Sequence, residues 1–289
     1  MRLLFTIPHY ANPEGDRRHG SGRASLEKRA GALRAAVVAL HQHFGEAQGM
    51  IDIAGRKVVP ANRGARHEIR IVVHTTGDDH ALDSLDLPGD LFEARHSGEQ
   101  EPKELGFCAH VTLREGLGDY DYFCYLEDDI VIADPWFFAK LRWFTGMAGK
   151  GAVLQPNRFE LGVRTRFHKV YVDGDLRPGV TAPFQDPEEK KSLEGRVLGR
   201  KVFFERPLNP HAGCFFLNPA QMEHWAGQDC FLDRDGSFVS PLESAAGLGI
   251  MKTFQVYKPA RRSANFLEVE HRDRNFIRLV GGDAPSSKL

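Results

Sequence analysis

Apolar and polar positions alternate in blocks along the first half of the chain. Residues 3–7, 69–74 and 122–126 are short, largely apolar runs, which is the pattern of buried β-strands. Between the first two, residues 26–44 repeat apolar side chains in alternating steps of four and three, which is typical of a helix packed on a sheet. This strand–helix alternation predicts an α/β fold with a mainly parallel, Rossmann-type sheet that helices cover.

Weaker patterns complete the same half. Asp134 and Pro135 predict a helix start, because aspartate caps a helix and proline fits its first position. Pro102 suits the first turn of another helix for the same reason. The remaining expected elements are a polar hairpin or loop at residues 50–67, a weak strand at 91–94, a helix at 102–117 and a strand at 152–155.

The second half of the chain is less regular. Residues 160–210 break the alternation, and we expect there a hairpin with a strand at 170–172 and its turn at Asp173-Gly174. The pattern then resumes, with a strand at 214–217, helices that begin at Asn218-Pro219 and Pro241, a strand at 253–257 and a frayed tail from residue 281. We therefore expect one domain of two halves, residues 1–155 and residues 156–289.

Composition narrows the classes of function. Lys and Arg total 38 against 39 Asp and Glu, so the net charge of −1 gives no basis for bulk affinity for nucleic acid or for membranes. The four cysteines form no Cys-x-x-Cys pair, and we interpret them as buried thiols in a reducing compartment. The first apolar run is too short for a signal peptide, and no window approaches the ~18 apolar residues of a membrane span. We expect a cytoplasmic protein without an integral membrane segment, which would meet a membrane only at its surface.

Three consecutive carboxylates follow the predicted strand at residues 122–126. Open α/β sheets bind ligands at the carboxyl ends of their strands, and unpaired carboxylates are costly to bury there. In an extended backbone Glu127 and Asp129 would project together, with Asp128 on the opposite face. Two oxygen ligands on one face suit Mg²⁺ or Mn²⁺, which could bridge to the phosphates of a nucleotide. An acidic turn or a helix cap is the alternative.

The segment YDYFCYLEDDIVI, in this order of elements, resembles the GT-A fold glycosyltransferases and their DxD motif. The resemblance covers about residues 1–155 well and the rest more loosely, and it departs from the motif at Glu127, where the family has Asp. It implies that Glu127 contacts the ribose or metal-bound waters, while Asp129 ligates the metal directly. It also implies a UDP- or GDP-sugar donor bound by the first half, and a glycan, lipid-linked or protein acceptor bound by the second.

A nucleotide-sugar site needs groups that hold the base and the ribose. Pro8, His9 and Tyr10 follow the first predicted strand, and Tyr10 could stack on the base. His74 and Thr75 end the second strand and could line the same pocket. A plain loop is the alternative in both places.

Other polar residues could contact the phosphates or the sugar. Arg23 ends a loop at residues 19–23 that leads into a helix, and a helix N-terminus attracts phosphate, although a solvated loop fits equally well. Lys103 could reach the nucleotide or remain a surface lysine. Gly213 would let a sugar approach the backbone, and His211 could exchange hydrogen bonds with it.

Two residues late in the chain could complete the chemistry. An inverting transfer needs a general base, and Glu243 lies in the first turn of a predicted helix, where the helix dipole keeps a carboxylate ionised. Simple charge complementation of that helix is the alternative. The resemblance favours the base, since inverting GT-A enzymes carry an acid at this place, with Asp233 and Asp235 as substitutes. It also implies His271 as a further metal ligand, because many GT-A enzymes supply a C-terminal histidine.

Two other functions remain open on sequence alone. A sugar nucleotidyltransferase or pyrophosphorylase would place a Gly-rich, basic phosphate loop directly after the first strand, whereas here Gly20 and Arg23 come well after its end at residue 7. The other is a non-catalytic sugar- or metal-binding module of the same fold.

Overall fold

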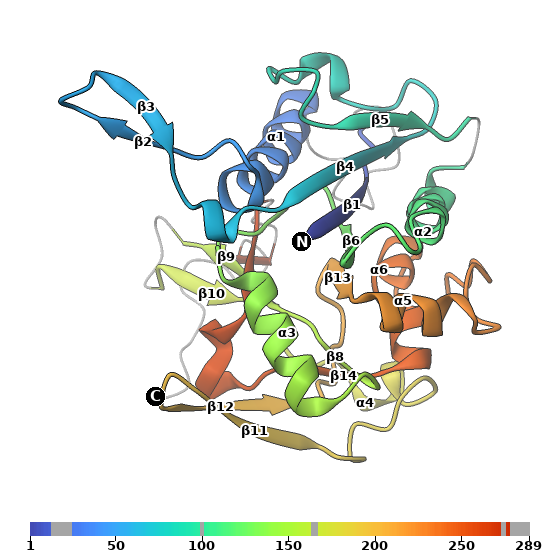
Figure 1. Cartoon of the computed structure of the whole chain (residues 1–289). Helices are drawn as coiled ribbons and strands as arrows, with labels where there is room; N and C mark the ends of the chain where they lie inside the picture. Colours follow the sequence, from blue (N-terminus) through green and yellow to red (C-terminus); the bar gives the residue numbers. More distant parts are fainter. Residues whose placement is uncertain (13–24, 99–100, 163–166, 273–275, 278–289) are drawn as a thin grey trace.

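The structure is a computed structural model of the chain, and it describes residues 1–12, 25–98, 101–162, 167–272 and 276–277. These residues form a mixed α/β fold with several sheets, which are partly parallel (Figure 1). The helices are α1 (Leu26–Phe44), α2 (Leu105–Glu115), α3 (Phe137–Ala148), α4 (Pro178–Thr181), α5 (Pro219–Ala226) and α6 (Pro241–Thr253). The strands are β1 (Arg2–Pro8), β2 (Gly49–Asp52), β3 (Lys57–Pro60), β4 (Glu68–Thr75), β5 (Glu93–His96), β6 (Tyr122–Leu126), β7 (Ile130–Val131), β8 (Ala152–Leu154), β9 (Asn157–Leu161), β10 (Lys169–Tyr171), β11 (Ser192–Val197), β12 (Arg200–Glu205), β13 (Cys214–Leu217), β14 (Gln255–Pro259) and β15 (Glu268–His271).

The largest sheet has the strand order β13-β6-β1-β4-β5. Strands β1, β4, β5 and β6 run parallel, and β13 runs antiparallel to β6. From β1 the chain moves to β4 on one side and then returns to β6 on the other. The strand order therefore reverses between β1 and β6, and such a switch point opens a crevice at the carboxyl ends of the strands, here beside Pro8 and Leu126.

Helices cover both faces of this sheet, as the alternating pattern predicts. Leu3, Phe5 and Ile7 of β1 point to one face, where they pack in a core with side chains of α1 and α3. Leu4 points to the other face and packs in a second core with α2, α5 and α6. Side chains of a strand alternate between its two faces, so a continuous apolar run is what a sheet buried on both sides requires.

The second half of the chain does not extend this sheet as one parallel array. Its strands form two further sheets together with β7 and β8 of the first half, with the orders β10-β9-β15-β7 and β11-β12-β14-β8. In the first of these, β15 pairs with β7, so that His271 lies opposite Ile130. A single, mainly parallel sheet is therefore too simple a description, and the additional pairing brings the last described strand next to the acidic segment.

Several elements begin or end elsewhere than the sequence predicts. The predicted hairpin turn at Asp173-Gly174 is wrong. Strand β10 pairs with β9, which precedes it in the chain, and the Asp173 carboxylate is buried in ion pairs with Arg158 and Lys258. Helix α3 begins at Phe137 and not at Pro135 as predicted. The Asp134 side chain accepts a hydrogen bond from the Trp136 N–H, which precedes the helix. The strands predicted at 91–94 and 253–257 lie two residues later, and the helix predicted from Pro102 opens with a short 3-10 turn.

Two expectations drawn from composition concern the cysteines and the absence of a membrane span. All four cysteines are free, with Cys124 and Cys214 buried and Cys108 and Cys230 half-buried. In the part of the chain that the structure describes, no helix is both long enough and apolar enough to cross a membrane. The predicted frayed tail from residue 281 lies outside the described residues.

Candidate functional site

A cavity of about 660 Å³ opens where β1 and β6 end. Residues from both halves of the chain line it. The sequence-predicted residues among them are Pro8, Tyr10, Lys103, Glu127, Asp128, Asp129, His211, Glu243 and His271. The cavity is also lined by Arg29, Arg158 and Phe276, which the sequence did not single out. The predicted residues His9, His74, Thr75 and Gly213 do not line it, and Arg23 lies outside the described residues.

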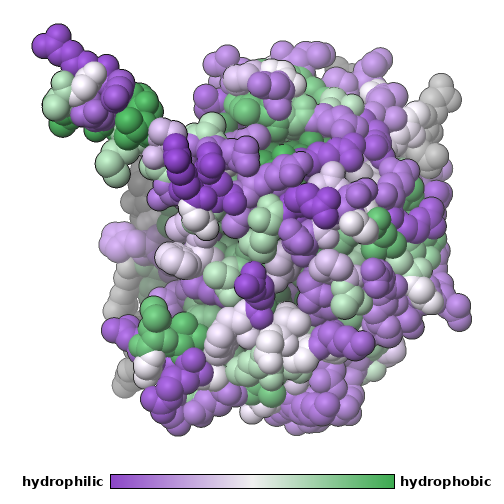
Figure 2. All heavy atoms as spheres, viewed as in Figure 1, coloured by the Kyte–Doolittle hydropathy of each residue, from purple (hydrophilic) through white to green (hydrophobic). Residues whose placement is uncertain are grey.

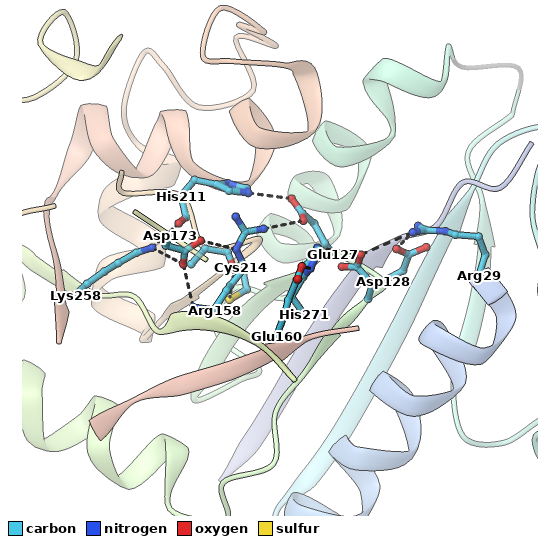
Figure 3. A network of polar contacts seen from close by, with 12 residues as sticks. Arg29, Glu127, Asp128, Arg158, Glu160, Asp173, His211, Cys214, Lys258 and His271 are labelled. Atoms are coloured by element: carbon cyan, nitrogen blue, oxygen red, sulfur yellow. Dashed lines mark hydrogen bonds and ion pairs between the residues drawn. The ribbon is translucent and has the colours of Figure 1, made fainter. Parts of the chain in front are cut away.

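The three acids lie on a turn that links β6 to β7. The Glu127 carbonyl accepts a hydrogen bond from the Ile130 N–H at 3.1 Å, so the extended backbone that we assumed for the triplet is wrong. The side chains of Glu127 and Asp128 point away from each other (Figure 3). The Oδ2 atom of Asp129, however, lies 3.9 Å from Arg29, which also pairs with Asp128. Glu127 faces Arg158 and His211, whereas Asp128 turns to Arg29. The turn, rather than the alternation of side chains along a strand, determines where the three carboxylates point.

Asp128 supports the turn from behind. Its carboxylate forms an ion pair with Arg29 and accepts a hydrogen bond from Nδ1 of His9 at 2.5 Å. Nε2 of His9 accepts the Ala81 N–H, so Nδ1 must carry the ring proton that goes to Asp128. Burial alone would raise the pKa of Asp128, but Arg29 and His9 outweigh it and lower the pKa. Asp128 is thus held as a carboxylate by protein groups, and His9 reaches the site through it.

His271 points one ring nitrogen at Asp129. Glu160 accepts a hydrogen bond from His271 Nδ1 at 2.8 Å, which leaves Nε2 at 3.4 Å from Asp129 Oδ2. Glu160 also accepts the backbone N–H groups of Phe276 and Ile277, at 3.1 and 2.8 Å. Burial would lower the pKa of His271, but Asp129 and Glu160 raise it above its ordinary value. A carboxylate that binds one ring nitrogen fixes the ring, so that the other nitrogen can point at a metal. Glu160 binds Nδ1 of His271 in this way, and Nε2 faces Asp129.

A buried row of alternating charges lies on the other side of the cavity (Figure 3). Arg158 donates from Nε to Asp173 at 2.8 Å and holds Nη1 at 3.9 Å from Glu127. Asp173 also accepts a hydrogen bond from Lys258 at 2.8 Å, and the same ammonium donates to the carbonyl of His211 at 2.5 Å. Because Asp173 binds the Nε end of the Arg158 guanidinium, the row holds its Nη1 end beside Glu127.

Glu127 fills space that only glycine can leave open. Gly213 has a φ of +62°, and a Cβ there would lie 2.8 Å from Glu127 Oε2. The Glu127 N–H also donates to the Gly213 carbonyl at 2.8 Å. The close approach at Gly213 is therefore made by Glu127, not by a sugar. Burial raises the pKa of Glu127 to about 8, with Asp129 and Glu243 adding to the effect and Arg158 opposing it.

Glu243 and Lys103 lie on the wall formed by α6 and the turn before α2. Glu243 is in the first turn of α6, and its Oε2 atom is buried with no hydrogen-bond partner among the residues that the structure describes. An unpartnered buried carboxylate oxygen beside a cavity is available to a ligand hydroxyl. Lys103 pairs with Glu101 at 2.6 Å and is more than half exposed, which places it at the rim.

His74 and Thr75 serve the packing of β4 instead of the cavity. Thr112 of α2 lies 3.1 Å from His74 Nε2, and His96 of β5 lies 3.4 Å from the Thr75 hydroxyl. Burial lowers the pKa of His74 to about 4, with Arg95 adding to the effect, so the ring is neutral. These two residues join neighbouring elements behind the site.

Asp129 and His271 are the side chains of the cavity that could hold a divalent cation, together with waters and the phosphates of a ligand. Among the described residues, no group of three or more His, Cys, Asp and Glu side chains forms a ready metal cage. Mg²⁺ is usually held by one or two carboxylates together with waters and substrate phosphates, at about 2.1 Å, so that neighbouring ligands lie about 3 Å apart. The 3.4 Å between Asp129 Oδ2 and His271 Nε2 is close to that spacing.

No known protein-family profile matches the chain, and no curated protein matches it either. The chemistry of this site is therefore inferred from the side chains that line the cavity. The site combines an oriented acid–histidine pair, a fixed guanidinium and a carboxylate with one oxygen that lacks a partner among the described residues, around one cavity at the switch point of the largest sheet. Such a set can hold an anionic ligand through a cation and can accept a proton on the opposite wall.

Proposed function

We propose that the chain is a metal-dependent glycosyltransferase of the GT-A type, which moves a sugar from a UDP- or GDP-sugar to an acceptor hydroxyl with inversion. The observation that carries the proposal is the meeting of Asp129 and His271 in the crevice between β1 and β6. The two residues are far apart in sequence, and each is oriented by buried neighbours. A merely acidic turn would not account for the Glu160–His271 pair behind it.

The donor nucleotide would lie along the carboxyl ends of β1 and β6. Tyr10 lines the cavity beside Pro8, and its hydroxyl donates to Asp79 at 3.2 Å, which fixes the ring for stacking on a base. The diphosphate would then reach the acids of the turn. Arg158, held by Asp173, supplies a buried positive charge that needs no reorganisation when charge develops on the leaving group.

Asp129 and His271 would hold Mg²⁺ or Mn²⁺, with Glu127 reaching it through water. The bound ion would neutralise the negative charge that builds on the departing diphosphate. The protein's own part is to keep these ligands in place, and Arg29 with His9 does so by fixing Asp128 at the centre of the turn.

Glu243 would act as the general base. It accepts the proton of the acceptor hydroxyl while the new bond forms at the anomeric carbon and the bond to the diphosphate oxygen breaks. It lies in the first turn of α6, and its buried Oε2 has no hydrogen-bond partner among the described residues, so this oxygen is available for that proton. The loops that shape the acceptor side come from the second half of the chain, where loops on a rigid scaffold commonly set specificity.

A thermal-shift screen tests the proposal directly. We expect UDP or GDP, or one of their sugars, to raise the melting temperature of the full chain in the presence of Mn²⁺ and much less with a chelator, because a ligand that binds only the folded state stabilises it. Adenosine monophosphate with Mn²⁺ serves as the control. If no nucleotide diphosphate or sugar nucleotide gives a metal-dependent shift, the proposal is wrong.

Replacing Glu243 with glutamine isolates the base. We expect kcat for sugar transfer to fall by about a hundred- to ten-thousandfold, since the amide cannot take the proton, while the metal-dependent thermal shift with the nucleotide stays intact. Glu101→Gln, at the rim of the same cavity, is the matched control and should change kcat little. An active Glu243→Gln enzyme would assign the base to another acid and leave the donor site as proposed.

A further inference from the structure

The hairpin of β2 and β3 stands apart from the rest of the molecule (Figure 1). Within the described ranges of the chain, its two strands pair with each other and with no further strand. It also exposes large aliphatic side chains, with exposed fractions of 65% for Met50, 71% for Ile51 and Val58, and 84% for Ile53. An isolated two-stranded hairpin is marginally stable in water, and exposed aliphatic side chains on it favour contact with another surface.

One face of the hairpin collects most of these side chains. Ile51 lies directly opposite Val58 in the pairing, so the two project from the same face. Ile53, two residues after Ile51, continues toward the turn. Figure 2 shows hydrophobic (green) side chains along the projecting hairpin next to a hydrophilic (purple) tip. The hairpin is therefore amphiphilic over a short length.

The charge of this segment differs from that of the whole chain. The hairpin itself, residues 49–60, has two basic side chains near its turn, Arg56 and Lys57, against one acidic side chain, Asp52, which is a net charge of +1, and Arg63 and Arg66 follow it. The whole chain has a net charge of −1. Aliphatic side chains flanked by Arg and Lys match the boundary of a bilayer, where acyl chains meet anionic headgroups and long basic side chains reach the phosphates.

We propose that the β2–β3 hairpin binds the surface of an anionic phospholipid bilayer. A second copy of this chain fits less well. A stable protein interface takes about 20–30 residues a side, whereas the hairpin spans residues 49–60. A symmetric contact between two such hairpins would also bring Arg56 and Lys57 of each copy together. The proposal is independent of the chemistry in the cavity, because no nucleotide is needed for binding.

Co-sedimentation of the full chain with vesicles tests the hairpin. We expect binding to vesicles of phosphatidylcholine and phosphatidylglycerol in a two-to-one ratio, and weak binding to phosphatidylcholine alone or at high salt. The double variant Ile51→Asp/Ile53→Asp should bind about tenfold more weakly or worse, because charged side chains replace the inserted aliphatic ones. Arg56→Glu/Lys57→Glu should lower binding to the anionic vesicles by about tenfold or more, since each basic residue contributes about a fivefold factor.

Leu198→Asp is the matched control, because Leu198 is 98% exposed at the turn of a different hairpin, β11–β12. It should sediment like the wild type, and all variants should keep the wild-type melting temperature. Equal loss in Leu198→Asp, wild-type sedimentation of the hairpin variants, or no preference for anionic vesicles overturns the proposal. A dimer in solution that Ile51→Asp/Ile53→Asp dissociates, with no vesicle binding, would identify a second copy as the occupant.

Discussion

Replacing Asp129 with alanine is expected to abolish the metal-dependent binding of nucleotide diphosphates and to lower the rate of sugar transfer by about a thousandfold or more. Asp129 is the acid that faces His271, at 3.4 Å, and its loss leaves the cation with one oriented protein ligand. The measurement is the thermal shift with UDP and GDP, with and without Mn²⁺, followed by the single-turnover rate with the donor that binds.

Asp134→Ala is the control for this variant. Asp134 lies five positions further along the same segment, where it pairs with Lys140 at 2.6 Å and does not line the cavity. Its removal should leave the metal-dependent shift unchanged. A full Mn²⁺-dependent shift in Asp129→Ala would show that the acids of the turn do not hold the ion.

The second large effect concerns stability. Asp173→Ala is expected to lower the free energy of unfolding by about 3–5 kcal/mol, because Arg158 and Lys258 would remain buried without their shared carboxylate. Burial alone would raise the pKa of Asp173, but the two cations outweigh it and hold the pKa well below its usual range. Urea unfolding of the wild type and the variant at neutral pH measures the difference.

The pH dependence of that difference has a definite sign. A carboxyl whose pKa is depressed by folding stabilises the protein above its unfolded pKa, near 3.9 for aspartate, and the stabilisation is lost as the pH falls below that value. The difference in the free energy of unfolding between the wild type and Asp173→Ala should therefore become smaller as the pH is lowered. Glu188→Ala removes an exposed pair with Lys191, which solvent screens, and should leave the free energy of unfolding almost unchanged. A similarly small loss in Asp173→Ala would mean that solvent reaches the buried row.

The parts of the fold that were predictable are those with local, contiguous signals. The apolar runs of β1, β4 and β6, the apolar period of α1 and the start of α5 at Asn218 all emerge from neighbouring residues, and Asn218 caps its helix through a full capping box. Since parallel strands end at the same edge of a sheet, the position of the acids relative to Pro8 and Tyr10 followed from the same reasoning.

What the sequence could not supply depends on pairings between distant segments. Arg29 and Arg158 are two of 38 basic residues, and nothing in their neighbourhoods marks them as cavity side chains. Arg158 reaches the acids only because β9 pairs with β15, and β15 pairs with β7. The Asp173-Gly174 pair has the composition of a hairpin turn, yet the ion pairs of Asp173 with Arg158 and Lys258 take precedence over that local preference. His271 was expected from the family resemblance, and its role as a ligand stays a prediction.

The pairing of β15 with β7 also has a consequence for the order in which the protein becomes able to bind its ligand. During synthesis the acids of the turn are made first, and His271 with the strand that carries it follows only after β14. At about 5–20 residues per second, the residues between Asp129 and His271 take on the order of ten seconds to synthesise. During that time the acidic turn has neither its histidine nor the wall of α6. A ligand that needs both Asp129 and His271 could therefore stabilise the fold only after β15 has paired with β7.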